Sequence, residues 1–240
     1  MSIISFISST VEGFLQLVYP PICVVCQHII QEMNDLQIVC TPCLQKMQLV
    51  PLHFIREQIM DRLNPCYLDG LEVVFQFDSI VQTIIHRIKY HKADRLAQKF
   101  AAYAVQFIDR SFLNRTALVL PVPLFISRER ERGFNQSQRI AEGFFQQTKN
   151  HVYPHLLKRV RSTNTQTELN REERLQNVSQ AFKVSEIDFI TGQSIIMVDD
   201  VVTTGATLNE CARELKNAGA LKVYGLTLAT PIQLEQGSLL

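Results

Sequence analysis

The chain has 240 residues, of which 46% are hydrophobic, and its formal net charge is +1. This length suits one large domain with a small module, and the hydrophobic fraction is enough for a sizeable core. A net charge near zero excludes a global basic field that would attract nucleic acid to the whole surface. Basic residues are concentrated locally in residues 86–99 and 128–139, which leaves room for a basic cleft.

The N-terminal segment, residues 3–19, has apolar residues at helical spacing that Ser, Thr, Glu and Gln interrupt. It lacks the basic start of a secretory signal and is too interrupted to span a bilayer. We expect a helix that packs on the protein's own body, with a membrane-surface helix as the alternative. The lack of an export signal predicts a cytoplasmic protein without a transmembrane segment, in which thiols stay reduced.

Four of the six cysteines form two CxxC pairs, Cys23 with Cys26 and Cys40 with Cys43. Four thiolates at this spacing favour a structural zinc (Zn²⁺) site that is tetrahedral and has no open position for catalysis. Disulfides are the alternative, and His28 is a competing ligand.

The rest of the chain alternates apolar strands with amphipathic helices. Strands are expected over residues 71–77, 117–120, 156–160, 181–184, 195–198 and 221–229, and helices over residues 80–90, 95–108, 137–147 and 207–218. This alternation predicts an α/β fold with a mostly parallel sheet and helices on both faces. We therefore expect an N-terminal helix and four-cysteine module over residues 1–65 and an α/β domain over residues 66–240. The polar residues 161–177 are expected to form either a lid or a plain surface loop.

Residues 195–207 read IIMVDDVVTTGAT, so that an apolar strand runs into two acids, a loop of small residues and a helix. Open α/β sheets bind their ligands at the carboxyl ends of the strands. Successive backbone N–H groups in such a loop form an anion cradle together with the helix N-terminus and the threonine hydroxyls. The predicted cradle comprises Thr203, Thr204, Gly205, Ala206 and Thr207.

The two acids, Asp199 and Asp200, directly precede this cradle, where they would repel a phosphate. They suit ribose hydroxyls, which donate hydrogen bonds, or hydroxyls shared with Mg²⁺. An ordinary strand with an Asp cap and a threonine-rich turn is the alternative. The segment resembles the signature of type I phosphoribosyltransferases that binds 5-phosphoribosyl-1-pyrophosphate (PRPP). That resemblance implies that Asp199 and Asp200 hold the ribose 2′ and 3′ hydroxyls and that residues 203–207 hold the 5′-phosphate.

A second anion site is expected where residues 128–136 read RERERGFNQ, after a strand that ends in proline. Arg128, Arg130 and Arg132 are expected in a loop, where guanidinium forks would hold the pyrophosphate of PRPP. Neutralisation of these arginines by the adjacent glutamates is the alternative. Lys89, near the end of a predicted helix, either neutralises phosphate or stabilises the helix C-terminus.

Taken together, these motifs resemble the ComF family over residues 23 to about 230. The resemblance is carried by the double CxxC, residues 88–90 (IKY), 121–124 (PVPL) and 132–136 (RGFNQ), Arg161, Thr163, Gln166, Arg174, residues 177–178 (NV) and 181–182 (AF), and the PRPP-type loop. One departure is Ser179-Gln180, which stands where the family usually has Arg-Gly. The resemblance implies a type I phosphoribosyltransferase-like domain with an N-terminal zinc-binding module.

The same resemblance implies a role in DNA uptake and natural transformation, with PRPP and incoming single-stranded DNA as partners in the cytoplasm. DNA-uptake or recombination proteins are further candidate partners. The other function that stays open is an active phosphoribosyltransferase of nucleobase or nucleotide metabolism, whose acceptor the sequence does not identify. In that enzyme Asp199 and Asp200 would be catalytic, and Mg²⁺ on the pyrophosphate would stabilise the leaving group.

Overall fold

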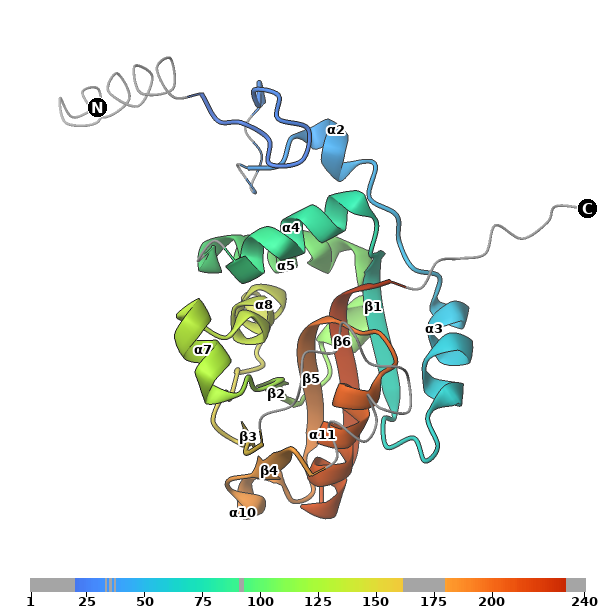
Figure 1. Ribbon diagram of the computed structural model, residues 1–240. Helices are drawn as coiled ribbons and strands as arrows, with labels where there is room; N and C mark the ends of the chain where they lie inside the picture. The colour runs from blue at the N-terminus through green and yellow to red at the C-terminus, as the bar shows by residue number, and fades with distance from the viewer. Residues whose placement is uncertain are drawn as a thin grey trace, which may run out of the picture. The chain divides into compact units, whose positions relative to one another are not determined.

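The computed structural model describes residues 20–32, 34, 36, 38–90, 93–161 and 180–231 (Figure 1). The chain forms two compact units, Met1–Met47 and Gln48–Leu240. The predicted N-terminal helix and nearly all of the predicted lid lie outside the described residues. In the part that is described, no helix is long and apolar enough to cross a membrane.

The described residues of the smaller unit, within 20–47, contain little regular structure. Its one labelled helix, α2 (Thr41–Leu44), begins directly after Cys40 and has a proline in its first turn. Ile30, Leu36, Val39 and Leu44 are its largest buried apolar side chains. Because this core is so small, cross-linking by a metal ion is a physically reasonable source of its stability.

Residues 48–65, which the sequence analysis grouped with the cysteine module, pack in the larger unit. They form α3 (Leu52–Gln58) and the 3₁₀-helix η1 (Met60–Arg62). Ile55, Ile59 and Leu63 are buried in the same core cluster as Leu208. The boundary between the units therefore lies after Met47, because these apolar side chains need a large core to cover them.

The larger unit is built on a four-stranded sheet in the order β1-β6-β5-β2. Its strands are β1 (Gly70–Gln76), β6 (Lys222–Thr230), β5 (Ser194–Val201) and β2 (Leu118–Pro121). All three pairings are parallel, as predicted. Residues 195–198 of the central strand β5 are 0% exposed, which is why they read as a continuous apolar run with no alternation.

Helices cover both faces of this sheet, as predicted (Figure 1). The helices after α3 are α4 (Ser79–Tyr90), α5 (Asp94–Ala104), η2 (Val105–Phe107), α6 (Arg110–Leu113), α7 (Ile126–Arg132), α8 (Gln136–Phe145), α10 (Ile187–Ile190) and α11 (Ala206–Asn217). On one face, residues of α3 and α11 share a core cluster with Ile195 and Met197 of β5. On the other face, Phe75 of β1 stacks on Phe100 of α5, with ring centroids 5.5 Å apart.

A separate two-stranded antiparallel sheet pairs β3 (Leu157–Arg159) with β4 (Phe182–Val184). The sequence analysis predicted both strands but not that they stand apart from the parallel sheet. Leu157 and Phe182 are buried in the core cluster that contains α11. One side of this small sheet is therefore anchored, and β3 can present Arg159 at a fixed place.

The arginine segment predicted to be a loop is instead the helix α7, which ends at Gly133 with a left-handed φ of 82°. In a helix, residues four apart share a face and residues two apart do not. Arg128 and Arg132 therefore lie on one face of α7, and Arg130 lies on another. The helix escaped prediction because none of its residues is buried, so it has no apolar stripe for periodicity to detect.

We predict that Gly143→Ala destabilises the protein. A Cβ at Gly143 of α8 would collide with the carbonyl oxygen of Gln98 in α5 and lie 2.8 Å from the Cβ of Ala101. In an open helix the same change stabilises by about 0.5–1 kcal/mol, whereas overpacking here should cost about 2 kcal/mol. Urea denaturation of the variant and of the wild type shows whether the free energy of unfolding falls or rises. The control is Gln82→Ala at an exposed position of α4, expected within about 0.5 kcal/mol of wild type. Unchanged or higher stability of Gly143→Ala would contradict the close contact between α5 and α8.

Candidate functional site

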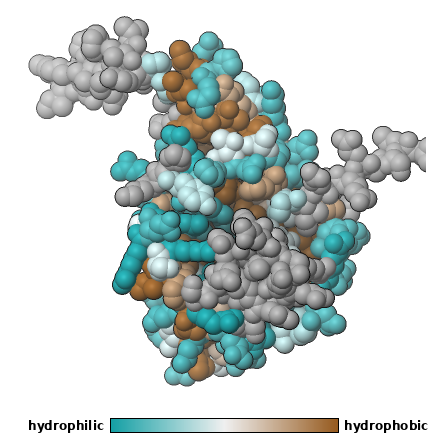
Figure 2. Space-filling view, in the orientation of Figure 1, coloured by the Kyte–Doolittle hydropathy of each residue, from teal (hydrophilic) through white to brown (hydrophobic). Residues whose placement is uncertain are grey.

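A cleft of about 370 Å³ opens where the parallel strands end, as expected for an open α/β sheet. Its lining includes most of the predicted site residues, namely Lys89, Arg128, Arg132, Asp199, Asp200, Thr203, Thr204, Gly205, Ala206 and Thr207. Arg130 is exposed and is not among the described residues that line the cleft. Figure 2 shows hydrophilic residues over α7, the helix that brings Arg128 and Arg132 to the cleft.

The two acids lie within β5, which continues through them to Val201. The predicted strand ended at residue 198, before the acids, because the apolar run stops there. Successive strand residues point to opposite faces of a sheet, so Asp199 and Asp200 meet different neighbours.

Asp199 is partly buried and is held by two hydrogen-bond donors that carry no charge. The Ser137 hydroxyl donates to its Oδ1 over 2.8 Å, and the backbone N–H of Asp200 donates to the same oxygen over 2.9 Å. Burial and the neighbouring Asp200 carboxylate raise the pKa of Asp199 to about 7, although these two donors and Lys89 act in the opposite direction. Asp199 therefore exchanges a proton near neutral pH, so it can accept or donate hydrogen bonds there.

The charge of Asp200 is compensated by a cation. The Nζ of Lys89 lies 2.6 Å from its Oδ2, and the backbone N–H of Val201 donates to its Oδ1 over 2.9 Å. The Asp200 side chain is 7% exposed and that of Lys89 is 25% exposed. The Lys89 ammonium group therefore compensates the charge of a deeply buried side chain. Lys89 thus contacts an acid of the predicted site in this structure.

Ser137 is a site residue that the sequence analysis missed. It is 1% exposed and follows Asn135, the N-cap residue of α8, whose side chain accepts from the Ser137 N–H over 3.0 Å. The Asn135 amide also donates to the carbonyl of Val122 over 3.1 Å, which ties the start of α8 to the end of β2. No local signal in the sequence connects Ser137 to an acid 62 residues away.

Arg159, which precedes the residues expected to form a lid, also lines the cleft. Its guanidinium lies 5.4 Å from the centroid of the Phe182 ring on the paired strand β4. Burial lowers the pKa of Arg159 below its ordinary value, and the charge of Arg128 acts in the same direction. Three arginines from two elements, α7 and β3, therefore converge on one cleft.

The cradle lies between β5 and α11. Gly205 is the N-cap residue of α11, with a left-handed φ of 77°. A Cβ at this position would come within 2.9 Å of Ile59 Cγ2 and 3.2 Å of Leu63 Cδ1. Both the backbone conformation and the close contact therefore require glycine. The first N–H groups of a helix have no intrahelical acceptor, so the start of α11 is suited to bind an anion.

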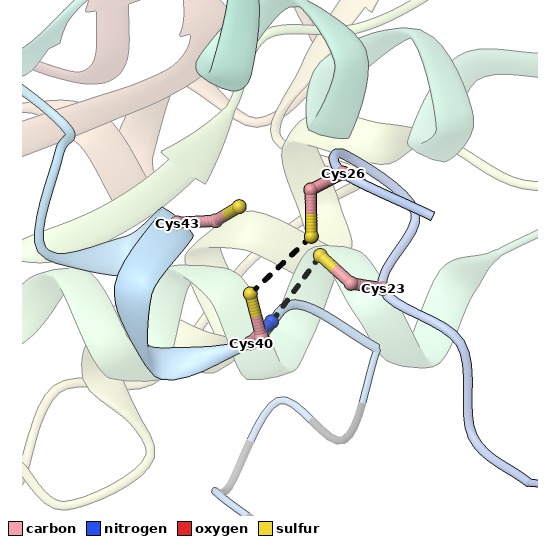
Figure 3. Close-up of side chains that lie close together, drawn as sticks. All are labelled: Cys23, Cys26, Cys40 and Cys43. Atoms are coloured by element: carbon pink, nitrogen blue, oxygen red, sulfur yellow. Dashed lines mark hydrogen bonds between the residues drawn. The ribbon is translucent and has the colours of Figure 1, made fainter. Parts of the chain in front are cut away.

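The four predicted metal ligands form a cluster in the smaller unit (Figure 3). Their Sγ atoms lie within 4.8 Å of one another, and those of Cys26 and Cys40 are 3.6 Å apart. Four sulfurs around a tetrahedral zinc ion are separated by about 3.8 Å, so the cluster matches the donor set and size of a structural zinc site. All of the cysteines are free thiols, so the structure contains none of the disulfides considered as the alternative.

His28 lies beside this cluster but is not one of the four grouped ligands. Its backbone N–H and its imidazole hydrogen-bond Cys26 and lower the pKa of that thiol to about 6. A thiol that ionises readily is a better metal ligand. The position of His28 therefore supports ligation by Cys26 rather than competition with it.

Comparison with known proteins agrees with this arrangement. The family model described as "Phosphoribosyl transferase domain" matches residues 110–235. Competence protein F of Haemophilus influenzae is 30% identical over 169 residues, which is 67% of this chain and 73% of that protein. DNA utilization protein YhgH of Salmonella typhimurium is 32% identical over 145 residues, which is 58% of this chain and 63% of that protein. Competence protein ComFC of Bacillus subtilis is 28% identical over 175 residues, which is 72% of this chain and 67% of that protein.

The larger unit is thus a phosphoribosyltransferase-type domain, with its cleft at the carboxyl ends of a parallel sheet. The smaller unit adds a four-cysteine cluster that can hold zinc. Both features are present, and the two competence proteins are 30% and 28% identical to the chain over 67% and 72% of its length. The chain therefore belongs to the ComF family.

We predict that the purified protein carries about one zinc ion per chain and that Cys40→Ser loses it, because three thiolates do not complete a structural site. Metal analysis of both proteins measures the stoichiometry. Cys66→Ser is the matched control, since Cys66 is an exposed free thiol outside the cluster, and it should keep the metal. Full zinc content in Cys40→Ser would rule out this four-thiolate site.

We predict that Asp199→Asn is more stable than wild type and that its advantage grows with pH. The ordinary pKa of this carboxyl is 3.8 and its folded value is about 7. Between these values the folded protein holds a proton that the unfolded chain has released, so wild-type stability falls as pH rises. Asparagine accepts the same two hydrogen bonds without charge, and its advantage should grow by about 2 kcal/mol from pH 5 to pH 8.

Urea denaturation across this pH range measures that difference. Asp188→Asn is the control, because Asp188 lies exposed on α10 and its variant should follow the wild-type curve. If the advantage of Asp199→Asn stays constant with pH, Asp199 is not a buried acid with a raised pKa.

Proposed function

We propose that this protein binds PRPP in the cleft at the carboxyl ends of β2, β5 and β6. The observation that carries the proposal is that one space of about 370 Å³ brings together two carboxylates, a glycine-containing helix start and several cations. A ligand that satisfies all three groups must offer hydroxyl donors and two separate anions. PRPP offers both anions and, between them, the two ribose hydroxyls.

The roles follow from the chemistry of each wall. Asp199 and Asp200 would accept the ribose 2′ and 3′ hydroxyls, and the cradle of residues 203–207 would hold the 5′-phosphate. Lys89, Arg128 and Arg132 would hold the pyrophosphate, since guanidinium groups bind its oxygens bidentately and an ammonium group adds a point charge. Mg²⁺ bound to the pyrophosphate would reduce its repulsion from the carboxylates.

We further propose that the protein is a competence factor that acts on incoming single-stranded DNA in the cytoplasm. The names of its relatives, competence protein and DNA utilization protein, support this role. Tyr90 supports it as well, because this residue is 62% exposed and lines the cleft together with Lys89. An exposed aromatic ring among cations suits a stacked base and a phosphate backbone. DNA-uptake or recombination proteins are the partners that such a role would require.

The alternative is an active phosphoribosyltransferase of nucleobase or nucleotide metabolism, supported by the match to a transferase domain. In this case the carboxylates would hold the ribose while its C1 passes through an oxocarbenium-like state. Mg²⁺ would then stabilise the departing pyrophosphate. Release of pyrophosphate from PRPP, measured against a panel of nucleobase and amine acceptors, separates this enzyme from a protein that only binds.

We predict that the wild-type protein binds PRPP in the presence of Mg²⁺ and that the double variant Asp199→Asn with Asp200→Asn binds it at least about tenfold more weakly. Hydrogen bonds to a charged acceptor contribute about 1.5–3 kcal/mol each, which corresponds to such a loss. Calorimetric titration gives both affinities. Asp188→Asn serves again as the exposed control and should bind like wild type.

Two results would contradict these proposals. Wild-type protein that does not bind PRPP, with or without Mg²⁺, would end the PRPP proposal. The DNA role is tested in the same preparation by titrating a single-stranded oligonucleotide at several salt concentrations, where phosphate contacts give an affinity that falls steeply with salt. Absence of any salt-dependent binding would rule out direct contact with DNA.

A further inference from the structure

We propose that Lys89 makes the cleft selective for ligands that carry both a ribose diol and a separate pyrophosphate, because it covers Asp200 until an anion draws it away. The inference rests on the proposed PRPP site and adds a rule of specificity to it. The rule concerns which ligands can bind, and it holds whether or not the protein transfers the phosphoribosyl group.

Each carboxylate oxygen of Asp200 already has a contact with the protein before any ligand arrives. Its Oδ2 is 2.6 Å from the Lys89 ammonium, and its Oδ1 accepts the N–H of Val201 over 2.9 Å. The side chain is 7% exposed, so a hydroxyl that comes from the cleft meets the ammonium group first. A ribose can therefore use this carboxylate only after Lys89 has moved.

Lys89 is able to move. It lies in the last turn of α4, its side chain is 25% exposed, and both it and Asp200 line the cleft. A lysine ammonium is a point charge on a flexible four-carbon stem, so it can change partner without a change in the backbone. The movement is nevertheless unfavourable by itself, since breaking a buried ion pair leaves an uncompensated charge.

A ligand must therefore offer a hydrogen-bond donor to Asp200 and an anion to Lys89. Ribose 5-phosphate offers hydroxyl donors to Asp200 but no anion to Lys89 at the far side of the sugar. Pyrophosphate alone offers an anion to Lys89 but leaves Asp200 without a partner. PRPP offers both, so the ion pair can be exchanged for two new interactions.

Asp199 and Arg132, which also line the cleft, do not impose this condition. Asp199 is held by the Ser137 hydroxyl and by a backbone N–H, neither of which is charged. Arg132 hydrogen-bonds the amide oxygen of Gln136 over 2.6 Å, and among the described residues it forms no ion pair with an acid. The selectivity is thus a property of the Lys89–Asp200 pair.

The test compares the binding of PRPP, ribose 5-phosphate and inorganic pyrophosphate by calorimetry, with Mg²⁺ held constant. Wild type should bind PRPP at least tenfold more tightly than either fragment. Lys89→Met keeps the stem and removes the charge. It should bind PRPP about tenfold more weakly and ribose 5-phosphate about threefold more tightly, because Asp200 is uncovered.

Two further variants sharpen the comparison. Asp200→Asn releases Lys89 and should bind pyrophosphate several-fold more tightly than wild type. If Lys89→Met does not fold, this measurement alone shows whether Asp200 restrains Lys89. Arg132→Met is the matched control within the cleft. It should weaken PRPP binding without strengthening ribose 5-phosphate binding, since the contact of Arg132 in the described residues is with the Gln136 amide.

The proposal fails if Lys89→Met leaves ribose 5-phosphate binding unchanged or weaker, as expected of a lysine that only attracts phosphate. It also fails if Asp200→Asn shows no gain for pyrophosphate. Failure of the PRPP site itself looks different, because wild type would then not bind PRPP at all. In that case the pyrophosphate arm still reports whether Asp200 restrains Lys89.

Discussion

The arrangement of the larger unit depends on two adjacent carboxylates at the buried end of the central strand β5. Burying a charge is costly unless partners compensate it, and the two acids receive different partners. Asp199 is held by Ser137 at the start of α8, and Asp200 by Lys89 at the end of α4. Each of these two helices thus contacts one of the acids, and the fold and the site are therefore stabilised by the same contacts.

The opposite wall of the cleft depends on packing rather than charge. The cradle must approach its ligand through backbone atoms, which requires Gly205 in a left-handed conformation. Ile59 and Leu63 fill the space behind it so closely that a Cβ would collide. Residues 48–65, which contain little that suggests a binding role, thus fix the position of the anion cradle. Their place in the larger unit follows from this contact.

The parts of the site that could be predicted are those whose residues lie close together in the sequence. The run of residues 195–207 predicted a buried strand, two acids and a helix start, and the spacing of the four cysteines predicted a cluster that can hold zinc, because local spacing determines this geometry. The contacts of Ser137 with Asp199 and of Lys89 with Asp200 could not be predicted, since they join elements far apart in the chain. The helix α7 was missed for the opposite reason, because it buries none of its residues and its local pattern carries no hydrophobic signal.

The structure also resolves a conflict that the sequence raised, in which two acids stand beside a site for phosphate. Their combined charge is smaller than their number suggests. The raised pKa of Asp199, about 7, leaves it partly protonated near neutral pH, and the charge of Asp200 is matched by Lys89. The arginines of α7 and β3 that line the cleft then leave it with a net positive field. An anionic ligand can therefore enter the cleft. Under the proposed binding of PRPP, Asp200 would accept a sugar hydroxyl only as its Lys89 contact is exchanged for a ligand group.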